Sequence, residues 1–224
     1  MERHEQVISD FLRFLNRNTS NFILKGGTSL RKCYNLDRFS EDIDLDAVKE
    51  NIIDAVDVFC KTQGYTYRIV KNTPFVKRCM INYGIDNRPL KVEVSYRRQF
   101  IPSEDTTCIN NINVYTIDRI AQMKANAYAA RDKIRDLYDI TFICNHYFDK
   151  LSNTTKNIIT DAVGNKGIEQ FDYLVKTQND PLIDTNKLET DFLKMFDKLG
   201  LLSEPHKLID LTPDTQKSIH KGRI

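Results

Sequence analysis

The amino-acid sequence predicts an α/β (α+β) protein in which a small mixed β-sheet core, flanked by helices, is followed by a helical C-terminal domain. Two features of its 224 residues predict this class. Up to residue 96, short apolar runs and alternating apolar and polar residues are typical of strands. From Thr116 onward, apolar residues recur at helical spacing. Between them, residues 101–112 are polar, and we expect this segment to link two domains, residues 1–112 and 113–224.

The first informative stretch is a short apolar run followed by two glycines. In residues 22–24, β-formers outnumber helix formers, which indicates a strand. Gly26 and Gly27 then end the strand, because glycine adopts backbone angles that other residues avoid. Thr28 and Ser29 are predicted to cap the helix that follows. The free N–H groups at such a helix start can bind a phosphate.

The next stretch has an acid at every second position, in the string DIDLDA. Side chains alternate across a strand, so Asp42 and Asp44 are expected on one face, roughly 7 Å apart along the backbone. Two carboxylates beside a phosphate-binding turn can hold hard divalent cations, as metal-assisted nucleotidyl transfer requires. Alternating acids also mark the wet face of many edge strands, and that interpretation stays open.

Three better-known motifs do not fit this stretch. An EF-hand loop would need glycine where Ala47 stands and glutamate where Ile53 stands. A P-loop would end in Gly-Lys-Ser/Thr, but Lys25 precedes the glycines. A dinucleotide-binding turn would need a third glycine, which is missing.

The rest of the sheet and its helices follow from periodicity. Alternation in LKVEVSY places Lys91, Glu93 and Ser95 on one face of a strand. The predicted strands would lie side by side in one mixed sheet. Helices are expected at residues 2–18 and 49–63, and further strands at residues 65–70, 75–83 and 90–96.

In the C-terminal half, the apolar spacing predicts helices. Their apolar faces fall within residues 117–130, 137–143, 157–163, 168–175 and 187–199. Residues 203–224 are polar, contain two prolines, and are expected to form a loosely held tail.

Composition narrows the functional classes. The chain is 41% hydrophobic and 29% charged, as in ordinary soluble proteins. Its net charge of +2 predicts no strong polyanion binding except through local clusters. No apolar run approaches the roughly 20 residues of a membrane span, so we expect no membrane association. Five scattered cysteines without CxxC spacing favour reduced thiols in a cytoplasmic protein over a zinc site.

The glycine pair followed by apolar-flanked acids resembles the signature of the polymerase-β-like nucleotidyltransferase superfamily. Within it, KGGTSL with RFSEDIDLD resembles the AbiEii/AbiGii-type toxin nucleotidyltransferases of bacterial abortive-infection and toxin–antitoxin systems. The resemblance implies a metal site for Mg²⁺ (or Mn²⁺) formed by Asp42, Asp44 and a third carboxylate, Glu93. Glu93 could instead be a surface acid paired with Lys91 or Arg97. Nucleotide binding is implied for Gly26, Gly27, Thr28, Ser29 and Ser40.

A second string, AYAARDKIRDLYDI, resembles the C-terminal motif of the same family. The resemblance implies catalytic roles for Lys124 and Asp136, and nucleotide binding by Arg131, Arg135 and Asp139. On one helix, Asp136 and Asp139 would share a face, as would Arg131 and Arg135. Taken alone, RDxxD is also typical of a solvated helix surface with ordinary ion pairs.

The resemblance covers about residues 22–143 and implies an enzyme. It would transfer a nucleoside monophosphate from an NTP to an acceptor hydroxyl and release pyrophosphate. The acceptor that the resemblance implies is RNA, at the tRNA acceptor end. A cognate antitoxin protein is implied as a partner. Two alternatives remain: a catalytically degenerate protein that binds a nucleotide or partner, and a small-molecule nucleotidyltransferase of the antibiotic-modifying type.

Overall fold

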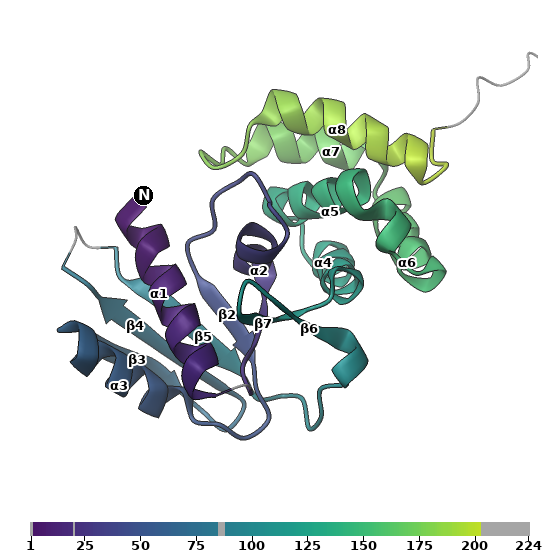
Figure 1. Ribbon diagram of the computed structural model, residues 1–224. Helices are drawn as coiled ribbons and strands as arrows, with labels where there is room; N and C mark the ends of the chain where they lie inside the picture. Colours follow the sequence, from purple (N-terminus) through teal and green to yellow (C-terminus); the bar gives the residue numbers. More distant parts are fainter. Residues whose placement is uncertain (1, 20, 85–87, 203–224) are drawn as a thin grey trace, which may run out of the picture.

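The computed structural model describes residues 2–19, 21–84 and 88–202. A mixed sheet of seven strands lies at its centre, in the order β3-β4-β5-β2-β1-β7-β6 (Figure 1). With its flanking helices and helical C-terminal part, it confirms the predicted fold class. The strands are β1 Ile23–Lys25, β2 Ile43–Asp46, β3 Thr66–Asn72, β4 Val76–Asn82, β5 Leu90–Ser95, β6 Thr106–Ile109 and β7 Ile112–Tyr115.

Two parallel pairings join the middle of the sheet. Strand β2 runs parallel to β5, and β1 runs parallel to β7, while the other neighbouring strands are antiparallel. The short helix α2 (Gly26–Cys33) connects β1 to β2. In the resulting register, Lys25 lies opposite Asp44, and Asp44 lies opposite Glu93. Three charged residues from three strands are therefore side by side on one face.

The other face of the sheet is apolar and packs against helices. Leu24, Leu45 and Val92 point to this face and are almost completely buried. Helix α1 (Glu2–Asn18) contacts β5 and β7, and α3 (Ile52–Gln63) contacts β3 and β4. The predicted helix at residues 2–18 is confirmed. The second helix begins three residues later than predicted, because the Asn51 side chain accepts a hydrogen bond from the Ile53 N–H and caps it there.

The predicted linker at residues 101–112 is wrong, because this segment belongs to the sheet. It contains the 3-10 helix η1 (Ser103–Asp105), strand β6 and the turn into β7. Asn110 and Asn111 have φ values of +52° and +58°, the backbone of a tight hairpin turn that asparagine tolerates better than most residues. Strand β7 runs across the boundary predicted at residue 112. The division of the chain into two domains stays a prediction.

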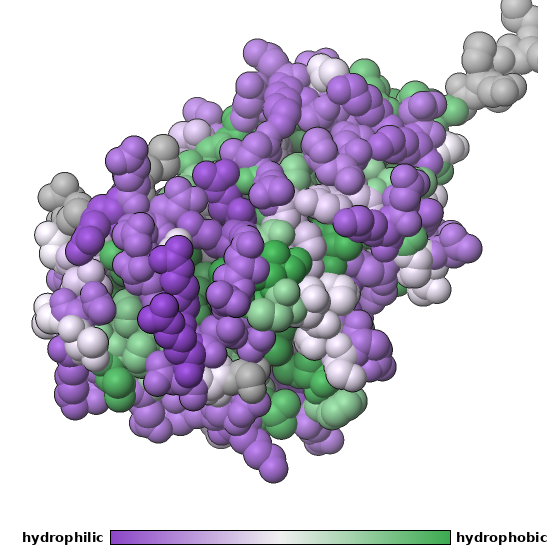
Figure 2. Space-filling view, viewed as in Figure 1, coloured by the Kyte–Doolittle hydropathy of each residue, from purple (hydrophilic) through white to green (hydrophobic). Residues whose placement is uncertain are grey.

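The C-terminal part is helical, as predicted. Helix α4 packs against α5 and α6, and α5 packs against α8. None of the described helices is long and apolar enough to cross a bilayer. Hydrophilic side chains cover much of the face seen in Figure 2, including α1 and the helices at the top. The predicted tail at residues 203–224 lies outside the described residues. The helices of this C-terminal part are α4 Ile117–Ala130, α5 Ile134–Tyr147, the 3-10 helix η2 Phe148–Lys150, α6 Asn153–Gly164, α7 Gly167–Thr177 and α8 Thr185–Lys198.

Candidate active site

Three carboxylates lie together on the sheet face that α1 and α3 leave uncovered. Asp44 on β2 is in register with Glu93 on β5, and Asp42 lies two residues before Asp44. Burial raises the pKa of Asp44 above its ordinary value, and the negative charges of Asp42 and Glu93 raise it further against the opposing charges of Lys91 and Lys25. The structure thus brings the three predicted metal ligands into one electrostatically coupled cluster.

Two of these carboxylates have cationic partners from the same chain. Lys91 Nζ lies 2.6 Å from Asp42 Oδ2, and Arg78 Nε lies 2.5 Å from Glu93 Oε2. Within the described ranges, no three His, Cys, Asp or Glu side chains converge as a metal site. The donor set is nevertheless all oxygen, as Mg²⁺ and Mn²⁺ prefer, and a cation would relieve the repulsion that raises the pKa of Asp44. The chemistry of the donors fits such an ion, although the side chains as placed do not converge on one position, and its binding stays a prediction.

The two glycines are needed for different reasons. Gly26 has a φ of +76°, and a Cβ there would lie 3.2 Å from Asp44 Oδ2. A Cβ on Gly27 would lie 2.9 Å from both Arg38 Nη2 and Ser40 Oγ. Gly26 therefore allows the turn to approach the carboxylates, whereas Gly27 makes room for side chains of its own chain. Gly27 therefore lies close to Arg38 and Ser40. Gly26 lines the cavity described below, and Gly27 and Ser40 do not.

The prediction that Thr28 and Ser29 cap the helix is wrong. Helix α2 begins at Gly26, so both residues lie inside its first turn, where they are buried. The Thr28 hydroxyl donates to the backbone carbonyl of Asp42, and the Ser29 hydroxyl donates to the carbonyl of Gly26 at 2.6 Å. Their hydroxyls hold the loop and the turn together. The N-cap position, Lys25, makes no side-chain cap.

Helices α4 and α5 supply a basic wall opposite the carboxylates. Lys124 on α4 and Arg131 at its C-terminal end both bind Asp136, at 3.3 Å and 2.8 Å. The Arg131 side chain is 61% exposed, whereas Asp136 is almost completely buried. The pKa of Arg131 is raised, chiefly by its hydrogen bond to Asp136 and in part by the charge of Asp44. Arg131 therefore faces both the helical wall and the carboxylate cluster.

Arg131 and Arg135 do not share a helix face, contrary to the prediction. Arg131 lies in the extended link between α4 and α5, and only Arg135 belongs to α5. Arg135 pairs with Asp180, and its Nη1 lies 3.8 Å from Glu41 Oε2. These contacts hold Arg135 on the loop side of α5, and it is not among the residues that line the cavity.

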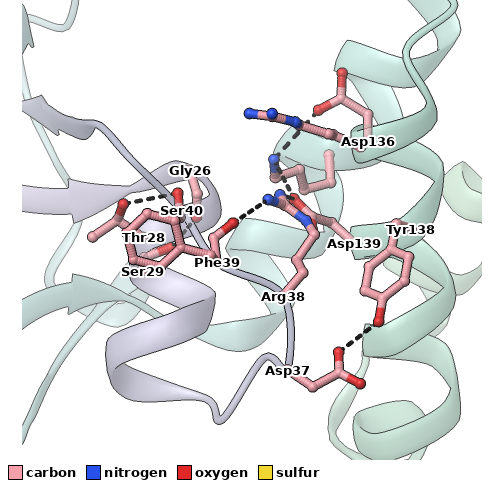
Figure 3. A network of polar contacts seen from close by, with 12 residues as sticks. Gly26, Thr28, Ser29, Asp37, Arg38, Phe39, Ser40, Asp136, Tyr138 and Asp139 are labelled. Carbon is pink, nitrogen blue, oxygen red and sulfur yellow. Dashed lines mark hydrogen bonds and ion pairs between the residues drawn. The ribbon is translucent and has the colours of Figure 1, made fainter. Parts of the chain in front are cut away.

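Asp139 is buried inside the protein instead of facing a ligand. Its side chain is fully buried and receives hydrogen bonds from Nε and Nη2 of Arg38, both at 2.7 Å. Lys124 Nζ lies 2.6 Å from its Oδ2. Figure 3 shows Arg38 reaching from the loop after α2 to Asp139 on α5. Asp139 thus fixes Lys124 and joins the loop to the helical part, and no atom of it is free for a nucleotide.

A cavity of about 680 Å³ separates the two walls. Asp44 and Glu93 line it on the sheet side, with Gly26 at the start of α2, and Lys124, Arg131 and Asp136 line it on the helical side. Residues predicted from two distant parts of the sequence therefore line a single cavity: Gly26, Asp44, Glu93, Lys124, Arg131 and Asp136.

The sequence model of one protein family, described as "Nucleotidyl transferase AbiEii toxin, Type IV TA system", matches residues 13–214. The chain belongs to this family. It is therefore a nucleotidyltransferase toxin of a type IV toxin–antitoxin system.

Two solved structures are similar to this AbiEii-family protein over most of its length. JHP933 from Helicobacter pylori has 28% sequence identity and a TM-score of 0.74, covering 89% of this chain and 90% of that one. A second H. pylori protein, provisionally described as a nucleotidyltransferase, has 26% identity and a TM-score of 0.69, covering 91% and 97%. No curated protein sequence matches the chain.

Sequence reasoning missed one acid and several cations of this AbiEii-family site. Asp46 lines the cavity and is held by Lys25 Nζ at 2.5 Å, by the Tyr115 hydroxyl at 2.9 Å and by Arg98 Nε at 3.3 Å. Its place as the third acid of the alternating string was the signal available. Arg98 lies beyond β5 in an irregular segment, where no pattern indicates the direction of a side chain.

Proposed function

We propose that this toxin transfers a nucleoside monophosphate from an NTP to an acceptor hydroxyl, with divalent metal and release of pyrophosphate. The observation that carries the proposal is the cavity in which the carboxylates of β2 and β5 face Lys124 and Arg131. Binding of a nucleoside triphosphate requires both the carboxylates on the sheet side and the basic side chains on the helical side of the cavity. Cations bind its phosphates, and carboxylates hold the metal that such phosphates accompany.

The basic wall has the groups to hold a triphosphate in one position. Arg131 is largely exposed and can bind phosphate oxygens in a bidentate manner. Lys124, held by Asp136 and Asp139, adds a positive charge at a fixed place. The first N–H groups of α2 have no side-chain cap, which leaves them to bind an anion beside Gly26. Asp136 acts in this proposal by orienting Lys124 and Arg131.

The acidic wall would hold the metal. Asp42, Asp44 and Glu93 are the residues we assign to it, and Lys91 and Arg78 would give up their present partners when it binds. A bound Mg²⁺ or Mn²⁺ draws charge off the phosphates and favours the attacking form of the acceptor hydroxyl.

We propose RNA as the acceptor, with the tRNA acceptor end as the specific case. The proposal is supported by the cations around the cavity, since an antibiotic of the aminoglycoside type is itself cationic and would need an acidic acceptor pocket. The basic lining residues are Lys25, Arg97, Arg98, Lys124 and Arg131. Because the family belongs to toxin–antitoxin systems, we also propose a cognate antitoxin protein that acts on this chain in the cytoplasm.

Incubation with each radiolabelled NTP, Mg²⁺ and total RNA tests this function. We expect label from one or more NTPs to move to RNA on a denaturing gel, and EDTA to prevent it. Asp44→Asn is the inactive control, and Lys194→Gln, on the exposed side of α8, is the matched active control.

One observation favours the rival, a protein that binds nucleotides without transferring them. The ion pairs of Asp42 with Lys91 and of Glu93 with Arg78 already satisfy two of the three acids. If NTP binds by calorimetry but no label reaches RNA or any other acceptor, this rival is correct and the transferase proposal is wrong.

A further inference from the structure

The uncovered face of the sheet continues beyond the cavity, across β4 and β3. Helices α1 and α3 pack on the opposite face, where Cys79 and Ile81 of β4 are fully buried. The register places Arg78 of β4 beside Glu93, and Lys71 of β3 beside Arg78. Adjacent strands are about 4.8 Å apart. A row of side chains therefore leads from the catalytic acids to the outer edge of the sheet.

This part of the face is positively charged. The β3–β4 hairpin places Arg68, Lys71 and Arg78 on this face, and residues 58–85 contain no aspartate or glutamate. Lys77 belongs to the opposite face, where it lies opposite Val94 and donates to Asn51. Arg68 lies opposite Met80, which in turn lies opposite Lys91, so Arg68 is on the uncovered face together with Lys71. Three basic side chains therefore lie on this face of a hairpin that has no acid of its own, in a chain whose net charge is only +2.

Arg68 and Lys71 are also available to a ligand. Both side chains are exposed, and within the described part of the chain neither has an ion-pair partner. By contrast, Arg78 and Lys91 are engaged with Glu93 and Asp42. Phe75, in the turn between β3 and β4, is 62% exposed and offers a surface on which a base can stack.

We propose that Arg68, Lys71 and Arg78 form the binding surface for the sugar–phosphate backbone of a single-stranded RNA acceptor. The inference rests on the proposed function and identifies where the acceptor lies. Measured between backbones, strand spacing puts Arg78 about 5 Å and Lys71 about 10 Å from Glu93. Over this span of about 5 to 10 Å, the cations would meet the first phosphates behind the reacting end.

An acidic protein segment is the other polyanion that such a surface could bind. The row of cations starts at the carboxylates where an acceptor hydroxyl must arrive, which favours RNA. A protein strand would instead pair with the free backbone edge of β3, beside the exposed Ile69 and Val70. Backbone pairing of that kind would not depend on the charges of Arg68 and Lys71.

The test compares Arg68→Gln/Lys71→Gln with Lys176→Gln/Lys194→Gln, a control that removes two exposed charges from α7 and α8. Binding of a short fluorescein-labelled single-stranded RNA is measured by anisotropy over a range of salt concentrations. Each lost phosphate contact lowers the slope of log K against log salt by about 0.7, so we expect a fall of about 1.4 in the sheet variant. Its affinity at low salt should fall about tenfold or more, and the control should match the wild type.

Wild-type affinity and salt slope in the sheet variant would overturn the proposal, and so would an equal loss in the control. Transfer assays separate this inference from the function on which it rests. If the sheet variant transfers with an unchanged KM for RNA, the proposed RNA-binding surface is wrong and the proposed transferase function is retained. If the wild type transfers nothing to RNA while only the sheet variant loses RNA binding, the surface stands and the transferase proposal fails.

Discussion

Asp44 and Asp139 lie on opposite sides of the site, and the protein treats their charges in opposite ways. Burial raises the pKa of Asp44, and the nearby acids Asp42 and Glu93 add to this effect. Burial also acts to raise the pKa of Asp139, but the charges of Lys124 and Arg38 outweigh it, so that pKa is lowered. Among the described residues, Asp44 on the sheet wall therefore has opposing charges nearby but no ion pair, whereas both aspartates of the helical wall are paired with basic side chains.

This difference separates binding groups from supporting groups better than residue type does. An uncompensated carboxylate at a cavity can gain most from a cation. A carboxylate that already accepts from two basic side chains has little left to offer a ligand, and it serves to hold those side chains. The family motif contains both kinds of aspartate, and only the structure distinguishes them.

The largest effect on stability should come from removing the charge of Asp139, the aspartate that is paired with Arg38 and Lys124. In Asp139→Asn, Arg38 and Lys124 lose a buried partner, and removal of one member of such a pair typically costs about 3–5 kcal/mol. We expect the free energy of unfolding in urea to fall by about that amount. A change below about 1 kcal/mol would show that the network contributes little to the fold.

The pH dependence of this loss sharpens the same contrast. Because the folded pKa of Asp139 is lower than its unfolded value, its stabilising contribution is present at neutral pH. It should disappear as the pH falls below the ordinary aspartate pKa of about 3.9 toward the folded pKa. Urea titrations of wild type and Asp139→Asn at pH 7 and at successively lower pH should give a difference that is largest near neutral pH and narrows as the pH falls below about 3.9.

Removing the charge of Asp44, on the sheet wall, should lower activity without lowering stability. Asp44→Asn removes a metal ligand in our proposal, and we expect kcat/KM for NTP to fall at least about a hundredfold, or about 2.7 kcal/mol. The melting temperature should stay the same or rise, because a buried, repelled charge is gone. Mg²⁺ should raise the melting temperature of the wild type and leave that of the variant unchanged. A variant with wild-type turnover would remove Asp44 from the mechanism.

Arg131 stands between the two walls and should show an intermediate effect. A charge-assisted hydrogen bond to phosphate is worth about 1.5–3 kcal/mol, so Arg131→Gln should raise the KM for NTP about tenfold or more. Its exposed side chain predicts little loss of stability. Steady-state kinetics with a parallel thermal melt measure both quantities. A stability loss with unchanged KM would assign Arg131 to the supporting network.

The smallest effect is expected at an ion pair outside both walls. Lys61 is 76% exposed where it pairs with Asp57 on α3, and ion pairs between exposed side chains contribute little to stability because water and salt screen them. Lys61→Gln should leave both the free energy of unfolding and the turnover nearly unchanged. It serves as the reference for the Asp139 measurement, and an equal loss in both variants would mean that burial does not distinguish them.

Periodicity was enough to predict most elements and the face shared by Asp42 and Asp44, because both depend on local spacing, which a sequence shows directly. The position of Glu93 beside Asp44 depends on the pairing of β2 with β5, and the sequence implied it only through the family resemblance. The β6–β7 hairpin was missed because its turn is Asn110-Asn111 in a polar stretch, without the usual glycine. Supporting contacts such as Arg38 with Asp139 join residues 101 positions apart, and no local pattern reports them. For the same reason, the need for Gly27 was attributed to a ligand when it comes from Arg38 and Ser40.

The ion pair between Arg38 and Asp139 also sets an order of events during synthesis on the ribosome. All seven described strands have been synthesised once the ribosome has added Tyr115, the last residue of β7. Asp139 lies 24 residues further along the chain. At about 5–20 residues per second, translation leaves an interval of roughly 1–5 s in which Arg38 has no buried partner. A nascent toxin whose sheet has folded by then would have its carboxylates in place without the fixed Lys124 opposite them. A cell that makes this protein therefore receives the assembled cavity only after the helical part has been translated.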